Sequence, residues 1–201
     1  MYSKLQYISQ GNTPSEQLRN IKNVLDHGCD WIQLRFKKQA NHLILPLAEQ
    51  IRELTLQYSA ILIINDSVDI AHHVDADGVH LGLQDQDISL ARSILGNSKI
   101  IGGTANTIQH VKQRLHENCN YIGLGPFRYT ETKEKLSPVL GVSGYRDIMG
   151  QLPVNARIPI YAIGGIQIED IKDIIKTGVH GIAISGALTH SPQLSIQFKS
   201  F

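Results

Sequence analysis

The chain has 201 residues, of which 42% are hydrophobic and 18% are charged, as in an ordinary globular protein. A formal net charge of +1 provides no overall basic field, so composition does not favour a nucleic-acid-binding protein. Cys29 and Cys119 form no metal motif or disulfide framework, which predicts a reducing compartment. The first residues do not resemble a signal peptide and no apolar run approaches the ~20 residues of a membrane span, so we expect a cytoplasmic protein without a membrane partner.

Short runs rich in β-branched residues alternate along the chain with amphipathic segments of helical length. The runs are continuously apolar rather than strictly alternating, which favours strands buried on both faces of a parallel sheet. Eight strands are predicted in this way, at residues 5–9, 31–36, 61–65, 78–82, 99–104, 121–125, 158–165 and 180–186.

The segments between these runs carry helix signals. Residues 15–28 place apolar side chains on one face and end at Gly28, as expected near a helix C-terminus. Residues 170–178 repeat the pattern and end at Gly178, and the segment 107–120 begins with a threonine suited to an N-cap.

Eight strands alternating with helices in about 200 residues predict a small (β/α)8 TIM barrel. No linker, low-complexity segment or repeat divides the chain, so we expect one domain over residues 1–201. The helix predicted at 67–74 is short, which leaves an open doubly wound α/β sheet as the alternative.

Polar residues and glycines follow the predicted strands. In a barrel these positions form the C-terminal face, where active sites are found. They are Gln33, Arg35 and Lys37 after the second strand, Asn65 and Asp66 after the third, Asp85 after the fourth, Thr104 and Asn106 after the fifth, Arg128, Thr130, Thr132 and Lys133 after the sixth, and the glycine-containing segments 163–166 and 185–187 after the last two.

Several of these features have two interpretations. The glycines after the last two strands either form simple turns or let backbone N–H groups approach a phosphate. Arg35 requires an anionic partner if it is buried, either Asp66 or a substrate. Asp66 and Asp85 either cap helices or hold Mg²⁺ beside a phosphorylated substrate. His80 lies within a strand and can be a core residue. Together, the glycines and the basic cluster predict two phosphorylated ligands, or one phosphorylated at both ends.

Five motifs follow one another along the chain: QLRFK (33–37), INDSVDIAHHVDADGVHLGLQD (64–85), YIGLGPFRYTETK (121–133), AIGGI (162–166) and GIAISGA (181–187). In sequence and in order they resemble the motifs of the thiamine phosphate synthase family. The chain resembles that family over nearly its whole length. The resemblance implies a TIM-barrel transferase. Such an enzyme condenses 4-amino-2-methyl-5-(diphosphooxymethyl)pyrimidine with 4-methyl-5-(2-phosphooxyethyl)thiazole, giving thiamine phosphate and pyrophosphate with Mg²⁺ as cofactor.

The resemblance also implies roles for individual residues. Arg35, Lys37 and Lys133 would stabilise the departing pyrophosphate, and Asp66 and Asp85 would bind the metal. The residues implied to contact the two substrates are Gln33, Arg35, Lys37, Asn65, Thr104, Thr130, Thr132, Lys133, Gly165 and Ser185. The polar loop after the sixth strand, which has no helical or strand period, is then interpreted as a lid over the phosphates.

Two residues depart from the family pattern. Leu83 replaces a glutamine and removes one polar contact, although it leaves the metal aspartate in place. Thr104 replaces a serine but keeps the hydroxyl group, so we expect substrate binding to survive.

Three other functions compete with this interpretation. A thiazole tautomerase-like relative would lack the second metal aspartate, and Asn106 stands where such an enzyme needs an acid–base histidine. A Schiff-base aldolase needs a lysine inside a strand, and the predicted strands offer none. The third alternative is a protein that binds thiamine phosphates without turnover. The sequence is also compatible with a homo-oligomer.

Overall fold

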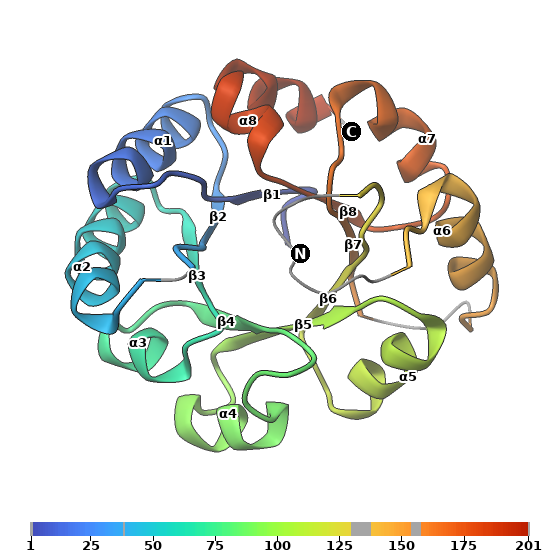
Figure 1. Ribbon diagram of the computed structural model, residues 1–201, viewed down its shortest axis with the longest axis horizontal. Coiled ribbons are helices and arrows are strands. Elements are labelled where there is room, and N and C mark those ends of the chain that lie inside the picture. The colour runs from blue at the N-terminus through green and yellow to red at the C-terminus, as the bar shows by residue number, and fades with distance from the viewer. Residues whose placement is uncertain (1, 38, 130–137, 154–157, 201) are drawn as a thin grey trace.

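Eight parallel strands close into a barrel with helices around its outside, as the computed structural model shows for residues 2–37, 39–129, 138–153 and 158–200 (Figure 1). The strand order is sequential, and β1 closes the barrel by pairing with both β2 and β8. This topology confirms the predicted (β/α)8 barrel and excludes the open doubly wound sheet.

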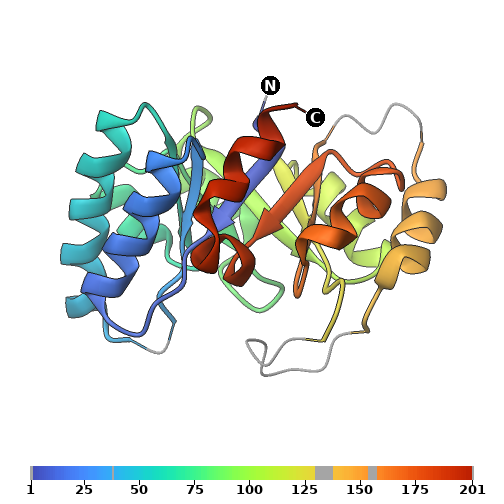
Figure 2. The same cartoon turned by 90° about the horizontal axis from the view of Figure 1, so that it is seen from above.

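Every predicted strand overlaps an observed one, and all but the fifth, predicted at 99–104, contain it completely. The strands are β1 (Leu5–Ile8), β2 (Trp31–Leu34), β3 (Ile61–Asn65), β4 (Gly78–Leu81), β5 (Ile100–Ala105), β6 (Tyr121–Leu124), β7 (Ile160–Ile163) and β8 (Gly181–Ile184). Figure 2 shows both ends of the described chain at the end of the barrel from which the strands depart. The carboxyl ends of the strands therefore lie together at the opposite end.

The helices surround this barrel, and their ends follow the local sequence signals. They are α1 (Pro14–Asp26), α2 (Asn41–Gln57), α3 (Val68–His73), α4 (Ile88–Leu95), α5 (Ile108–His116), α6 (Gly141–Gly150), α7 (Ile171–Ile175) and α8 (Gly186–His190), with 3₁₀ helices η1 (Ile168–Asp170) and η2 (Pro192–Ser200). Thr107 caps α5 by accepting the N–H of His110 at 3.2 Å, as predicted. Gly28 follows α1 with φ +83°, the left-handed conformation that glycine supplies after a helix. None of the described helices is both long and apolar enough to cross a membrane.

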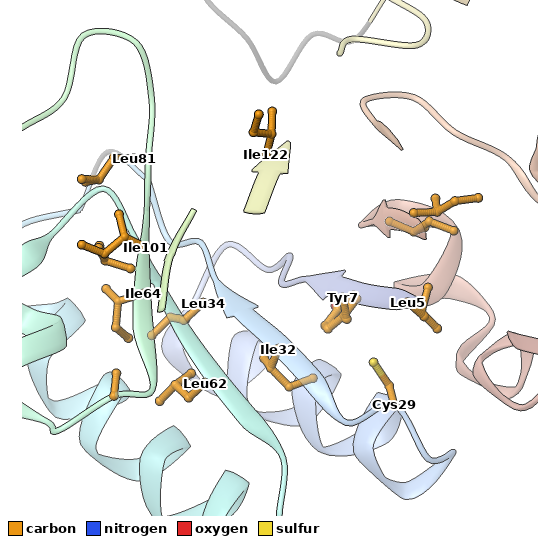
Figure 3. Close-up of a cluster of buried hydrophobic side chains, with 14 of the residues drawn as sticks. Leu5, Tyr7, Cys29, Ile32, Leu34, Leu62, Ile64, Leu81, Ile101 and Ile122 are labelled. Carbon is orange, nitrogen blue, oxygen red and sulfur yellow. The ribbon is translucent and has the colours of Figure 1, made fainter. Parts of the chain in front are cut away.

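Two groups of buried side chains hold the barrel together. One lies between strands and helices and includes Ile32, Leu34, Leu62 and Ile64 (Figure 3). The other contains Ile8, Trp31, Ile63, Tyr121, Tyr161 and Ala183. In this second group the Trp31 ring packs edge-on against Tyr121 and Tyr161, with centroids 5.1 and 5.0 Å apart. Edge-to-face packing of this kind favours one fixed arrangement of the rings.

Glycine at position 102 makes room for one of these rings. A Cβ atom on Gly102 in β5 would lie 2.2 Å from Cζ of Tyr121, so any larger residue would displace the ring. The Tyr121 hydroxyl is thereby held at a fixed height in the barrel, where it meets polar residues of the candidate site.

Candidate active site

The described residues predicted to form the site lie at the carboxyl ends of the strands. Gln33 is in β2, Asn65 ends β3, Thr104 is in β5 and Ser185 follows β8. Arg35, Lys37, Asp66, Asp85 and Gly165 lie in the segments that follow β2, β3, β4 and β7. Thr130, Thr132 and Lys133, and with them the loop interpreted as a lid, lie outside the described residues.

Lys37 and Asp66 form an ion pair, with Nζ 2.9 Å from Oδ2. The chain leaves β3 in a left-handed turn, because Asp66 has φ +65° and its N–H donates to the carbonyl of His80 at 2.9 Å. Positive φ is uncommon outside glycine, and aspartate is among the residues that tolerate it. The turn thus sets the direction in which the Asp66 carboxylate leaves the backbone.

The Asp85 carboxylate converges on that of Asp66. Its Oδ2 accepts the N–H of Gly82 at 2.6 Å, which anchors the side chain to the end of β4. Burial raises the pKa of Asp85, hydrogen bonding to Asp66 raises it further, and the charge of Lys37 opposes both effects. Two carboxylates this close repel each other when both are ionised, which favours the protonated form of one of them.

This acidic pair suits a small divalent cation. Mg²⁺ prefers oxygen ligands and is often held by one or two carboxylates together with substrate phosphates and water. The described residues contain no group of three or more His, Cys, Asp or Glu side chains that could hold a metal. A cation at Asp66 and Asp85 would therefore depend on the substrate for further ligands.

Arg35 brings a second cation to the same side of the barrel. Its backbone is fixed by the Ser9 hydroxyl, which accepts the Arg35 N–H at 2.8 Å, and by Gln17, whose Nε2 donates to the Arg35 carbonyl at 3.3 Å. Burial lowers the pKa of Arg35, whereas the charge of Asp66 raises it. Asp66 therefore interacts with both cations: it forms an ion pair with Lys37, and its negative charge acts on Arg35. Asp66 was one of the two anionic partners considered for Arg35 from the sequence.

A hydrogen-bonded network runs through the barrel interior to Thr104. Gln6 Nε2 donates to the Tyr121 hydroxyl at 3.2 Å, and His80 lies between two hydroxyl groups, those of Tyr121 (2.9 Å from Nδ1) and Thr104 (3.0 Å from Nε2). Burial raises the pKa of Tyr121 far above its usual value, so its hydroxyl stays neutral. Gln33 is buried beside Tyr121, and its Nε2 has no hydrogen-bond partner among the described residues.

Sequence reasoning missed most of this network. It treated His80 as a residue of the core, and it singled out neither Gln6 nor Tyr121. The available signal was a polar residue flanked by apolar ones within a strand, as in GVHLG at 78–82, because side chains alternate between the two faces of a strand.

Arg114 on α5 is a further residue that sequence reasoning missed. It is 4% exposed and ties together the ends of two strands, since Nε donates to the Thr104 carbonyl at 3.1 Å and Nη2 to the Gly82 carbonyl at 3.0 Å. Glu117 accepts from Nη1 at 2.6 Å. Because the Gly82 N–H holds Asp85, this arginine supports the acidic pair from outside the barrel.

Asn106 has a structural partner. It is buried, and its Nδ2 donates to the carbonyl of Gly125 at the end of β6. An amide in this setting joins two neighbouring loops and supplies no acid–base group.

The glycines predicted to bind phosphate adopt conformations that few other residues reach. Gly164 and Gly165 follow β7 with φ +97° and +67°. The carbonyls of both accept hydrogen bonds from Arg128, which lies in the segment after β6. The segments that follow β6 and β7 are therefore joined.

A family model described as thiamine monophosphate synthase matches residues 5–188. This chain belongs to that family. It is 58% identical over 192 residues to a thiamine-phosphate synthase of Flavobacterium psychrophilum, covering 95% of this chain and 93% of the relative. It is 55% identical over 197 residues to the corresponding protein of Flavobacterium johnsoniae, covering 98% and 93%.

A solved structure of a thiamine phosphate pyrophosphorylase from Pyrococcus furiosus has the same fold. It superposes with a TM-score of 0.85 at 28% identity, covering 98% of this chain and 94% of that one. The family resemblance inferred from the five motifs is thereby confirmed, while the roles of individual residues stay predictions.

Proposed function

We propose that this chain condenses the pyrimidine diphosphate with the thiazole phosphate, forming thiamine phosphate and releasing pyrophosphate. One observation carries the proposal: Asp66 and Asp85 converge beside Lys37 and Arg35 at the carboxyl end of the barrel. Relatives that align with nearly all of the chain are thiamine-phosphate synthases.

The two carboxylates and the two cationic side chains at this end of the barrel suit the diphosphate group of the first substrate. Asp66 and Asp85 would hold Mg²⁺, which when bound would offset negative charge on the diphosphate. Lys37 can move from Asp66 to a phosphate oxygen once a cation takes its place, since its side chain is 47% exposed. Arg35 is partly buried and its backbone is fixed by Ser9 and Gln17, and a guanidinium in such a place binds phosphate oxygens well.

The reaction needs charge stabilisation and positioning more than acid–base groups. The bond between the pyrimidine methylene carbon and the diphosphate oxygen breaks, and the electron pair leaves with the oxygen. Lys37, Arg35 and Lys133 would donate hydrogen bonds to the negative charge that develops there. The thiazole nitrogen then supplies the electron pair for the new bond to the same carbon, so a protein nucleophile is unnecessary.

The pyrimidine ring needs hydrogen-bonding partners in a largely apolar barrel. We propose that Gln33, Asn65 and Thr104 fill this role. The Gln33 amide has an unused N–H among the described residues, and the Thr104 hydroxyl stands at the end of the interior network. Donors held in this way are oriented before the substrate arrives.

The second substrate would be held by its phosphate at the ends of β7 and β8. Gly165 would offer its backbone N–H, with Ser185 nearby in the chain segment after β8. Thr130, Thr132 and Lys133 are assigned to the phosphates on the sequence motif. The left-handed backbone at Gly164 and Gly165 supports this assignment, because such turns direct N–H groups toward anions.

A turnover assay with both substrates tests the proposal. The purified chain should release thiamine phosphate and pyrophosphate with Mg²⁺, and excess EDTA should abolish both products. Binding of both substrates without turnover would indicate a sensor. Proton exchange on the thiazole without condensation would indicate the tautomerase-like activity, although the Asn106–Gly125 hydrogen bond supports no such reaction. Full activity in EDTA would refute the metal roles of Asp66 and Asp85.

A further inference from the structure

Arg128 holds the turn formed by the two glycines after β7. Its backbone N–H donates to the Gly164 carbonyl at 3.0 Å, and its Nη1 donates to the Gly165 carbonyl at 2.6 Å. The guanidinium is itself held by Asp170, whose carboxylate oxygens lie 2.9 and 3.0 Å from Nη2 and Nη1. Two successive carbonyl groups therefore point toward one residue.

The direction of these carbonyls sets the direction of the N–H groups that follow them. A trans peptide unit is planar, with C=O and N–H pointing in opposite directions. The N–H groups of Gly165 and Ile166 must therefore point away from Arg128. Among the described residues, neither N–H has a hydrogen-bond partner. Two adjacent free donors with a common orientation are the usual backbone arrangement for binding an anion.

Local sequence makes this turn possible but does not secure it. Gly164 and Gly165 accept positive φ, and a Cβ on Gly164 would lie 2.8 Å from Cβ of Pro126. Glycine is also the residue with the most freedom to leave such a conformation. Asp170 adds a further tie, because its Oδ2 accepts the N–H of Gln167 at 2.8 Å. The turn is therefore fixed from both of its ends.

We infer that Arg128 is a positioning residue for the thiazole phosphate: held by Asp170, it keeps the N–H groups of Gly165 and Ile166 turned toward that phosphate. The inference rests on the proposed function, which places this phosphate at the segment after β7. It assigns to Arg128 and Asp170 a role that acts through the backbone and involves no contact with the substrate.

A direct ion pair between Arg128 and the phosphate is the competing explanation. The guanidinium has five N–H donors, and three of its hydrogen bonds already go to Gly165 and Asp170. Its charge is balanced by the Asp170 carboxylate, and it also stacks on the Phe127 ring, 5.2 Å from the centroid. These contacts leave the backbone donors as the better anion ligands.

Removal of Asp170 separates the two explanations. If Arg128 bound phosphate directly, Asp170→Asn would free the guanidinium and would leave phosphate binding unchanged or make it tighter. If Arg128 positions the turn, Asp170→Asn releases the guanidinium from its place and weakens binding, as Arg128→Gln does. The double variant should then bind phosphate no more weakly than either single variant, because the two substitutions remove the same support for the turn.

Calorimetry with thiazole phosphate and with inorganic phosphate provides the measurement. Arg128→Gln and Asp170→Asn should each raise the Kd for thiazole phosphate about tenfold, the scale of one hydrogen bond involving a charged group. The KM for the pyrimidine diphosphate should stay within about twofold. Lys176→Gln is a matched control, because it removes a surface ion pair with Asp173 and has no contact with the glycine turn among the described residues.

Two results would overturn the inference: unchanged binding in Arg128→Gln, or unchanged or tighter binding in Asp170→Asn. Amide NMR of the ligand-free protein is an independent test, since the Gly165 and Ile166 resonances should move in Arg128→Gln, and fixed resonances would also refute it. If the wild-type chain neither turns over nor binds thiazole phosphate, the proposed function fails by itself. The amide resonances and inorganic phosphate would still test the role of Arg128.

Discussion

The imidazole of His80 is hydrogen-bonded to the hydroxyl of Thr104, with Nε2 3.0 Å from Oγ1. The other ring nitrogen of His80 is occupied by Tyr121, so the imidazole is held on both sides. Both residues of the bond come from neighbouring strands, β4 and β5, whose register places His80 opposite Gly102. The orientation of the Thr104 hydroxyl at the site is therefore set inside the barrel.

Thr104→Val should weaken binding of the pyrimidine diphosphate. Valine keeps the shape of threonine but removes the hydroxyl, and with it the hydrogen bond to His80 Nε2. The loss of one hydrogen bond is worth about 0.5–1.5 kcal/mol, so the KM should rise by roughly two- to tenfold. Thr104→Ser keeps the hydroxyl and is the control, which should behave like the wild type. A normal KM in the valine variant would remove Thr104 from the site.

Lys37→Gln should reduce turnover while leaving stability nearly unchanged. The Lys37–Asp66 pair is partly exposed, and pairs of this kind contribute about 0–1 kcal/mol to folding. One charged contact to a developing oxyanion is commonly worth ~2.7–4 kcal/mol, which predicts a fall in kcat of about 100-fold or more. Steady-state kinetics and thermal melting measure the two effects.

Lys22→Gln is the control for this variant, because it removes a similarly exposed ion pair, with Asp26 on α1. It should change neither kcat nor KM. A large loss of thermal stability in Lys37→Gln with normal turnover would make Lys37 a structural residue.

Gly165→Ala should raise the KM for thiazole phosphate more than the KM for the pyrimidine diphosphate. Gly165 has φ +67°, and an alanine in the left-handed region costs about 1–2 kcal/mol, so the turn should distort. Gly28→Ala is the control, since Gly28 has φ +83° at the end of α1, away from the site. Both variants should have a lower melting temperature than the wild type, and only Gly165→Ala should change the affinity for thiazole phosphate. Equal changes in both KM values would contradict the assignment of Gly165.

The strands could be predicted because parallel strands covered on both faces read as apolar runs, and all eight were found. Their ends were less certain: the run 158–165 contains only Ile160–Ile163 as strand. The acidic pair could also be predicted, since Asp66 and Asp85 follow adjacent strands of the barrel. Such predictions need only the order of the elements.

Arg114 and the Arg128–Asp170 pair could not be predicted, because they depend on contacts that no local pattern encodes. Arg114 lies on a helix with polar neighbours and reads as a solvent-exposed residue. It is buried because Gly103 leaves space for it, where a Cβ would lie 2.6 Å from its Cδ. Arg128 and Asp170 are 42 residues apart and meet only once β6 and β7 are neighbours.

Arg114→Met should lower stability and also raise the Mg²⁺ concentration needed for turnover. The variant leaves the carbonyls of Gly82 and Thr104 and the Glu117 carboxylate without their donor. Breaking a buried charged pair by removing one partner costs about 3–5 kcal/mol. Glu117→Gln keeps the arginine and its hydrogen bonds to both carbonyls, so it should leave the Mg²⁺ requirement unchanged. Urea denaturation and Mg²⁺ titration measure the outcomes, and a stability loss below about 0.5 kcal/mol would contradict the contacts described for Arg114.

Asp85→Asn should make the Mg²⁺-free protein more stable and much less active. Burial and the neighbouring Asp66 raise the pKa of Asp85, so the folded state binds its proton more tightly than the unfolded chain does. An acid with a raised pKa reduces stability at neutral pH, and that stability returns as pH falls through its folded pKa, above the ordinary value of about 3.9. Asparagine removes the charge and keeps an oxygen for the Gly82 N–H. The melting temperature at neutral pH should therefore rise.

The pH dependence of melting separates this explanation from a general effect of substitution. In the Mg²⁺-free wild type, acidification toward the folded pKa of Asp85 should recover part of the stability, and Asp85→Asn should lack that component. Asp87→Asn is the matched control two residues away: hydrogen bonds from Ser89 lower the pKa of Asp87, so loss of its charge should not raise the melting temperature. With both substrates present, Asp85→Asn should need far more Mg²⁺ and recover only part of the wild-type rate. A lower melting temperature together with normal turnover in Asp85→Asn would show that Asp85 is a structural residue and would remove it from the metal site.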